Sequence, residues 1–387
     1  MQEKRQLGVI GSSVFAPRDH HSVSLEEAMF TVTKAALCDA GISIDDIDGI
    51  VVASCDQMDG RAISIMAASG SVGGVGRDIL STPSSGEHAF VLASLRVKSG
   101  IYQTHLVVSW SPLETDSVNE VQRLSNDPYF HRALPLDDLA SHALQANVLE
   151  SRIPGLHAAA VEVTRTNREH GHMAYPDQSA HPSESVWIDG GKMLRYPISE
   201  GMVSKPAFAA VAIVIASEAW IKAHQPSHVA WVHGMGWATE TAFLGDRDLS
   251  QLPSLVAAGE QAFAQAECKV SDIDLAEVAD ATPYQQLLSL EALGFCPRAH
   301  WVQATQAGEF GKQGRLPVNL SGGALSFNPV FCSGLMRIME AANQVRGKAG
   351  VHQQVKVKKA LAHGSSGFAM QYNTVVIFGD KVQGLLA

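Results

Sequence analysis

Short apolar runs alternate with longer helical patterns along the chain, and one such arrangement occurs twice. Segment 40–53, AGISIDDIDGIVVA, has small residues at the end of a helical pattern, a polar turn, and then a β-branched run typical of a buried strand. Segment 266–279, AECKVSDIDLAEVA, repeats this order, including Asp-Ile-Asp. The pattern therefore predicts two helix–turn–strand units of the same construction.

A second pair of similar segments follows the first pair. SSGEHAFVLASLRVKSG (84–100) and CSGLMRIMEAANQVRGK (332–348) both pass from Ser-Gly into a helical pattern that ends near a basic residue and glycine. The shared order favours internal duplication over coincidence, and the alternation of strands and helices predicts an α/β fold. We expect residues 1–114 to form the first part of the N-terminal half, 115–245 an inserted loop domain with the end of that half, and 246–387 the C-terminal half.

Composition and charge narrow the class of protein. The 387 residues carry a formal net charge of −10, which argues against a nucleic-acid partner. No apolar run has the length of a membrane span and the N-terminal residues do not resemble a signal peptide, so we expect a cytoplasmic protein without membrane contact. The five cysteines are widely spaced without a C-x-x-C pair, which predicts neither disulfides nor a zinc site.

Two glycine-rich segments are candidates for ligand contact. VNLSGGALSFNPVFCSG (318–334) contains Gly322 and Gly323, where the main chain can approach a ligand closely. ALAHGSSGFAMQYNTVVIFG (360–379) places His363 before Gly364, Ser365 and Gly367, and such a turn can offer N–H groups to an oxyanion. Plain tight turns would have the same composition.

Two other motifs carry little weight. SGSVGGVGRD (69–78) lacks the Gly-Lys-Ser/Thr that a phosphate-binding P-loop needs. His170, His172 and His181 lie in a polar segment without carboxylates at metal-ligand spacing, so no metal site is expected.

Taken together, these segments resemble the thiolase superfamily, and especially its sterol-carrier-protein and lipid-transfer-protein branch. The most specific match is LPVNLSGGALS (316–326), and segments 127–146 and 277–296 resemble that branch's loop domain and its acidic turn. Over the whole chain the resemblance implies a five-layered αβαβα fold from two pseudo-symmetric halves. It also implies a homodimer, a coenzyme A thioester as substrate and no bound cofactor.

The departures from the family pattern fall on its chemistry. The family's C-x-x-G, whose cysteine takes the acyl group, is matched by Pro83-Ser84-Ser85-Gly86, and proline has no nucleophilic side chain. Ser84 and Cys332 are the alternative candidates for a covalent nucleophile, although a serine hydroxyl needs an adjacent base. The family's Gly-His-Pro is matched by 327–329, where Asn328 can donate a hydrogen bond but cannot carry a proton.

Some relatives of this branch that lack the cysteine cleave β-hydroxyacyl-CoA thioesters by a retro-aldol reaction. This chemistry needs a base for the β-hydroxyl and donors for the enolate oxygen. We expect His363 or Tyr284 to carry the proton, Asn328 to polarise the thioester, and His88 to lie near the pocket. Packing roles for Tyr284 and His88 remain open. Residues Gly322, Gly323, Gly364, Ser365 and Gly367 are the candidate substrate or oxyanion loop.

The competing hypothesis is a subunit without activity of its own. The resemblance implies partners of two kinds, a second thiolase-like chain or a small zinc-ribbon and OB-fold protein. Loss of both the cysteine and the histidine fits a scaffold that completes a partner's site as well as it fits a retro-aldolase. Nothing in the sequence identifies the acyl group.

Overall fold

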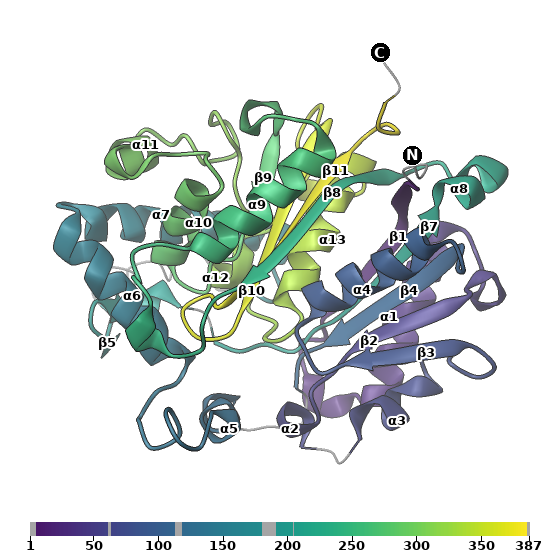
Figure 1. Ribbon diagram of the computed structural model, residues 1–387, viewed down its shortest axis with the longest axis horizontal. Helices are drawn as coiled ribbons and strands as arrows, with labels where there is room; N and C mark the ends of the chain where they lie inside the picture. Colours follow the sequence, from purple (N-terminus) through teal and green to yellow (C-terminus); the bar gives the residue numbers. More distant parts are fainter. Residues whose placement is uncertain (1–4, 61–62, 113–117, 180–190, 204, 385–387) are drawn as a thin grey trace.

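The computed structural model describes residues 5–60, 63–112, 118–179, 191–203 and 205–384. Its centre is a nine-stranded sheet in the order β3-β2-β4-β7-β1-β8-β11-β10-β9 (Figure 1). The strands are β1 Leu7–Phe15, β2 Gly49–Ala53, β3 Asp78–Thr82, β4 Thr104–Trp110, β7 Ala210–Ser217, β8 Ala230–Thr239, β9 Leu275–Glu277, β10 Lys359–Ser366 and β11 Tyr372–Gly379. A two-stranded sheet of β5 Met193–Arg195 and β6 Ile198–Ser199 lies apart from it.

The large sheet consists of two halves with the same topology. In the first half, β2 pairs in parallel with β3 and β4, β4 pairs with antiparallel β7, and β7 with antiparallel β1. In the second, β9 pairs in parallel with β10 and makes a parallel bridge to Val318, β10 pairs with antiparallel β11, and β11 with antiparallel β8. The repeated order confirms the duplication. The second half begins with β8 at Ala230, before the expected boundary at 246, because β8 has the position that β1 has in the first half.

The repeated Asp-Ile-Asp has the same structural role in both halves. The first aspartate closes a short turn: Asp46 accepts the Ser43 N–H at 2.8 Å, and Asp272 accepts the Lys269 N–H at 2.9 Å. The second aspartate of each copy, Asp48 or Asp274, accepts two main-chain N–H groups at the start of β4 or β10 respectively. The sequence echo therefore specifies how each turn is joined to the neighbouring strand.

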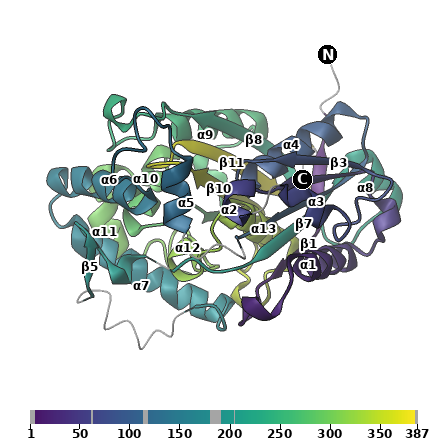
Figure 2. The same ribbon diagram turned by 90° about the horizontal axis from the view of Figure 1, so that it is seen from below.

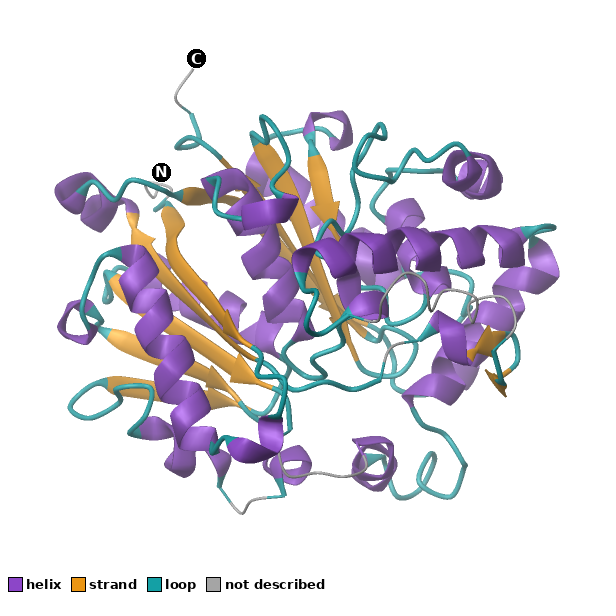
Figure 3. Ribbon diagram, turned by 180° about the vertical axis from the view of Figure 1, so that it is seen from behind, coloured by secondary structure: helices purple, strands orange, loops and turns teal. Residues whose placement is uncertain are grey.

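Helices cover both faces of each half (Figure 3). They are α1 Leu25–Ala40, α2 Asp56–Asp59, α3 Ser64–Ser69, α4 Gly86–Ser99, α5 Val118–Ser125, α6 Asp138–Arg152, α7 Leu156–Ala174, α8 Glu218–His224, α9 Pro253–Ala266, α10 Pro283–Ala292, α11 Trp301–Gln306, α12 Gly323–Ser326 and α13 Ser333–Arg346. Helix α1 packs on β1 and β7, α9 packs on β8 and β11, and α4 and α13 contact each other between the halves. Three apolar clusters fill the spaces between these layers, which gives the five-layered αβαβα arrangement.

The inserted region lies mainly over the second half. Helices α6 and α7 contact α10, α11 and α12, and Figure 2 shows them gathered on the same side of the molecule as these helices. Among the described helices, none combines the length and apolar character that crossing a membrane would require.

Candidate functional site

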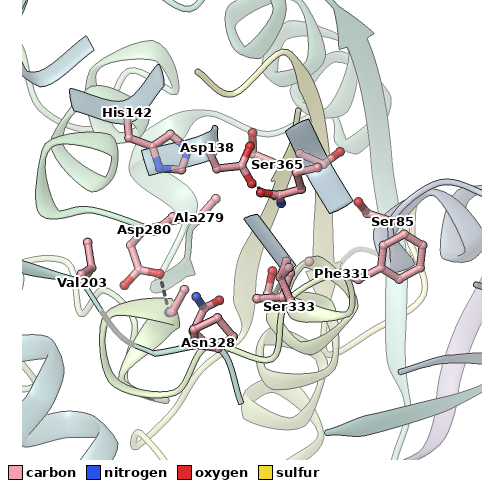
Figure 4. A pocket seen from close by; sticks show the side chains of 18 of the residues that line it. Ser85, Asp138, His142, Val203, Ala279, Asp280, Asn328, Phe331, Ser333 and Ser365 are labelled. Atoms are coloured by element: carbon pink, nitrogen blue, oxygen red, sulfur yellow. Dashed lines mark hydrogen bonds between the residues drawn. The ribbon is translucent and has the colours of Figure 1, made fainter. Parts of the chain in front are cut away.

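The segments that the sequence singled out meet in one cavity of about 1410 Å³. The loop before α4, the segment from α12 to α13, the turn after β10 and the inserted region all contribute to its lining. Figure 4 shows several of these side chains, including Ser85, Asp280, Asn328 and Ser365, around the space. The cavity therefore joins the two halves to the inserted region, as expected of a substrate site.

The position that holds the nucleophile in the resembled family lies at this cavity. Pro83, Ser84 and Ser85 line it, and α4 begins at Gly86, where a Cβ atom would lie only 2.7 Å from the Cβ of Leu335. The Ser84 hydroxyl forms a hydrogen bond with Nδ1 of His88 one turn later, and the His88 ring lies with its centroid 6.0 Å from that of Tyr372. His88 is thus placed beside the cavity rather than among its lining residues.

Asp280 lines the cavity just after β9. Its Oδ1 accepts the Ala324 N–H at 2.6 Å, and its Oδ2 accepts the Asn167 side-chain amide at 2.7 Å. These bonds and the charge of Arg337 favour the ionised carboxylate, but complete burial outweighs them and raises the pKa of Asp280 to about 7. This carboxyl therefore changes charge near neutral pH while facing the cavity.

Arg337, on α13, also lines the cavity although its side chain is almost fully buried. Its Nη1 forms an ion pair with Glu277 at 3.1 Å and donates to the Ser321 hydroxyl at 2.7 Å. Within the described residues, its Nε and Nη2 have no hydrogen-bond acceptor. A buried guanidinium with unused donors is costly unless another group accepts from it, and a ligand oxygen would do so.

Another buried acidic residue, Glu340, lies one turn along α13 from Arg337. Glu340 accepts hydrogen bonds from the Tyr175 hydroxyl and from Nε2 of His352, the latter at 2.8 Å. The histidine lowers the pKa of Glu340 against the effect of burial, and Glu340 in turn raises the pKa of His352. These contacts hold a carboxyl group and an imidazole on the side of α13 that also carries Arg337.

Glu87 was not anticipated from the sequence. It is completely buried, and a Cβ atom on Gly334 or Gly364, both of which line the cavity, would overlap it. Burial raises the pKa of Glu87, and the neighbouring His88 and Ser366 oppose the rise only in part. The Glu87 carboxyl thus lies directly against two glycines that line the cavity. An acidic residue within the apolar pattern of α4 was the available signal.

The glycine-rich loops have different roles from those expected. Gly364, Ser365 and Gly367 line the cavity, but Gly322 and Gly323 do not appear in its lining. The N–H groups of Gly322 and Gly323 are used within the loop, by the Asn319 carbonyl at 2.8 Å and the Ser321 hydroxyl at 3.3 Å. Both glycines have positive φ, and a Cβ atom on Gly323 would overlap Asp280. They are therefore required for close packing around the carboxyl.

Asn328 lines the cavity as expected, whereas His363 and Tyr284 do not. His363 is completely buried: its Nδ1 accepts the Ala279 N–H at 3.4 Å, and its Nε2 contacts Oδ1 of Asn373 at 2.9 Å. Burial lowers its pKa to about 4, so the ring is neutral at pH 7. The geometry therefore gives His363 a packing role, which differs from the expected proton transfer.

Tyr284 lies at the start of α10 and points toward Glu150 of α6, to which its hydroxyl donates. Nδ1 of His157 is 3.2 Å from the same hydroxyl. Burial and the Glu150 charge raise the pKa of Tyr284 well above its ordinary value. A phenol held in this way is a poor base, and it lies outside the cavity lining.

The remaining reactive groups do not form a site. Cys332 is buried among the carbonyls of Ala209 and Pro329 and the Ser111 hydroxyl, and burial raises the pKa of its thiol to about 12, so it remains protonated. In the described part of the chain, no group of three or more His, Cys, Asp or Glu residues is arranged to hold a metal ion. Nδ1 of His170 is hydrogen-bonded to the Asn319 carbonyl, and His181 lies outside the described residues.

Comparisons with known proteins agree with this architecture. The family model "Thiolase C-terminal domain-like" matches residues 224–380. The acetyl-CoA acetyltransferase of Methanothermobacter thermautotrophicus is 30% identical over 44% of this chain and 43% of its own length. Sterol carrier protein 2 of Oryctolagus cuniculus is 28% identical over 43% of this chain and 34% of its own. The chain thus covers less than half the length of these two relatives.

A solved structure covers nearly the whole fold. The structure titled "Ltp2-ChsH2(DUF35) aldolase" matches 97% of this chain and 98% of its own with a TM-score of 0.81, at 19% sequence identity. This match establishes the arrangement of helices and strands along essentially the complete chain.

Proposed function

We propose that this chain, which belongs to the thiolase superfamily and is similar to its sterol-carrier-protein branch, binds an acyl-CoA thioester and breaks or forms a carbon–carbon bond without a covalent acyl-enzyme. The observation that carries the proposal is the pairing of Asp280 and Arg337 in one cavity. One is a carboxyl with a pKa of about 7, and the other is a guanidinium with unused donors. Proline at position 83 removes the usual route through a thioester.

Asp280 has the properties of the general base in this reaction. A base works best when its pKa is close to the operating pH, and burial brings Asp280 there. Its carboxylate takes the proton of a β-hydroxyl group. The O–H electrons then form the carbonyl, the Cα–Cβ bond breaks, and its electron pair moves to the thioester as an enolate.

Arg337 and Asn328 are the groups that would stabilise this enolate. Charge develops on the thioester oxygen, and Arg337, which lines the cavity, has Nε and Nη2 groups without an acceptor among the described residues. Preorganised donors of this kind act strongly where water is excluded. The proton that Asp280 has taken then returns to Cα, giving a shorter acyl-CoA and a free aldehyde or ketone. The same steps in reverse form the bond.

The test is a mass-spectrometric turnover assay of the purified chain on β-hydroxyacyl-CoA and β-ketoacyl-CoA thioesters. We expect cleavage of a β-hydroxyacyl-CoA to a shorter thioester and a carbonyl compound, with no mass added to the protein. Asp280→Asn should lower the rate at least about 100-fold, the scale of general acid–base contributions. Asp246→Asn, at an exposed aspartate outside the cavity lining, is the matched control. Accumulation of an acyl-protein would contradict the proposal.

A second candidate is a non-catalytic subunit that completes a partner's site. Exposed apolar side chains in the inserted region favour this role: Tyr129 is 86% and Phe130 66% exposed, with Leu124 and Leu134 nearby in sequence. Such a patch fits a protein partner better than water. The partner classes to test are a second thiolase-like chain and a small zinc-ribbon and OB-fold protein. Absence of turnover on every thioester, alone and with these partners, would favour the scaffold role.

A further inference from the structure

The wall of the cavity that the inserted region forms carries several polar side chains, which a hydrocarbon ligand could not satisfy. Gln122 of α5, Asn126 beyond it, and Asp138 and His142 of α6 all line the cavity. The Asn126 amide is used by the Leu136 carbonyl, and the Gln122 amide donates to Oδ2 of Asp138. The groups that remain for a ligand are mainly Asp138 and His142, which Figure 4 shows side by side.

The position of these two side chains follows from the construction of α6. Residues four apart lie on the same face of a helix, one turn above the other. The helix begins after Asp137, whose side chain accepts the Ala140 N–H at 2.7 Å, and Ala143, Ala146 and Leu149 bury its apolar face in the core. With this face held, Asp138 and His142 are directed to the cavity.

The two groups offer complementary hydrogen bonding. Burial raises the pKa of Asp138 to about 6, against the effect of Gln122, so the carboxylate is mostly ionised at pH 7. Burial lowers the pKa of His142 to about 4, so its ring is neutral and has one donor and one acceptor nitrogen. Neither His142 nitrogen has a hydrogen-bond partner within the described residues. The wall therefore presents an acceptor beside a donor.

An alkyl or steroid group against this wall would leave His142 without a partner and Asp138 with Gln122 alone, which is costly for polar groups shielded from water. A hydroxyl group satisfies both, because it can donate to the Asp138 carboxylate and accept from the His142 N–H. We infer that the acyl group bound in the cavity carries a hydroxyl in addition to the β-hydroxyl and that Asp138 and His142 recognise it. This inference rests on the proposed binding of an acyl-CoA thioester.

Binding measured by titration calorimetry tests the inference without any need for turnover. The probes are butyryl-CoA with 4-hydroxybutyryl-CoA and octanoyl-CoA with 8-hydroxyoctanoyl-CoA, none of which has a β-hydroxyl group to be cleaved. We expect at least one hydroxylated probe to bind at least about tenfold more tightly than its alkyl partner, since sites built for a hydroxyl discriminate strongly against analogues that lack it. The Asp138→Leu/His142→Leu variant should lose or reverse this preference.

Two further variants guard against a general loss of structure. Asn147→Leu changes an exposed residue of α6 outside the cavity lining and should keep the wild-type preference. Asp138→Asn keeps the side-chain shape and should weaken the preference only in part. Circular dichroism of every variant checks that the helices are retained.

The other possible outcomes would overturn either the inference or the proposed function. Equal affinity for both members of each pair, or a preference that survives in the double variant, would overturn the inference while leaving acyl-CoA binding intact. A third outcome concerns the β-hydroxyl group. If the double variant loses only a preference for 3-hydroxybutyryl-CoA over butyryl-CoA, Asp138 and His142 recognise the β-hydroxyl, and the inference is also overturned. Failure of every thioester to bind the folded wild-type protein would refute the proposed function itself.

Discussion

Replacing Asp280 by asparagine should change how stability depends on pH. The ordinary pKa of this carboxyl is 3.8, and in the fold it is raised to about 7 because the group is completely buried. A raised folded-state pKa means that the folded protein holds the proton more tightly than the unfolded chain does. The stability that this proton contributes is therefore complete below pH 3.8 and is lost as the pH rises through 7.

The size of the effect follows from the pKa shift. Between pH 5 and pH 7 the unfolded carboxyl is ionised while the folded one is still mostly protonated. Each pH unit then costs up to about 1.4 kcal/mol, and less near pH 7 where the folded carboxyl is half ionised, so the wild-type free energy of unfolding should fall by about 2 kcal/mol relative to Asp280→Asn. The curve should flatten above about pH 8. Asparagine also changes the hydrogen bonds to Ala324 and Asn167, but that cost is the same at every pH and cancels in the comparison.

Urea unfolding followed by tryptophan fluorescence gives this quantity for both proteins at pH 5, 6, 7 and 8, and Asp246→Asn serves as the control. A wild-type minus Asp280→Asn difference that changes by less than about 0.5 kcal/mol over this range would refute a raised pKa. The pH dependence of turnover provides a second test of this pKa. The wild-type rate should increase with pH and level off above about 7 as the Asp280 carboxylate forms. A rate that decreases over the same range would refute the role of Asp280 as base.

Three other predictions follow from the placement of particular side chains. Arg337→Met should lower turnover on the same thioesters by about 100-fold to 1000-fold, as for the loss of an oxyanion donor, and retained turnover would exclude the donor role. It should also lower the free energy of unfolding by about 3 kcal/mol or more, because Glu277 is left buried without its partner. Tyr284→Phe should keep turnover within about twofold of the wild-type rate, since the Tyr284 hydroxyl donates to Glu150 outside the cavity lining. A loss near 100-fold would show that Tyr284 takes part in the reaction. Leu80 is exposed on the edge strand β3, so we expect a homodimer that forms through this edge. Leu80→Glu should dissociate this dimer in sedimentation experiments, and a wild-type monomer at micromolar concentration would contradict the prediction.

The sequence was informative where local rules decide the structure. The two Asp-Ile-Asp turns, the helices that follow Ser-Gly and the loop at 83–86 could all be located from it, because capping, turn chemistry and periodicity act between near neighbours. The duplication was visible for the same reason, since both copies retain their local signals. The sequence predicts the boundary between the halves at 246, after β8, because β8 precedes the second copy of the repeated segment in the chain.

The chemistry of the site was less predictable because it depends on burial and on distant pairs. The pKa of Asp280 follows from enclosure by α7 and α12, and the charge of Arg337 is supported by Glu277, which is distant in sequence. His363 shows the effect of alternation along a strand. Successive side chains point to opposite faces, so His363 faces the core while Gly364 lines the cavity.

Glu277 provides the sharpest test of how the two charges in the cavity depend on each other. Its carboxyl group lies 3.1 Å from Nη1 of Arg337, so we expect it to offset part of the positive charge that Asp280 experiences. Arg337 lowers the pKa of Asp280, but burial still outweighs it. Glu277→Gln keeps the side-chain shape and removes the offset, so Arg337 should act more strongly on Asp280 and lower its pKa by about one unit. The acidic limb of the pH–rate profile should then move to lower pH by the same amount, while Asp246→Asn leaves it in place. An acidic limb that does not move would mean that Glu277 does not offset the charge of Arg337 at Asp280.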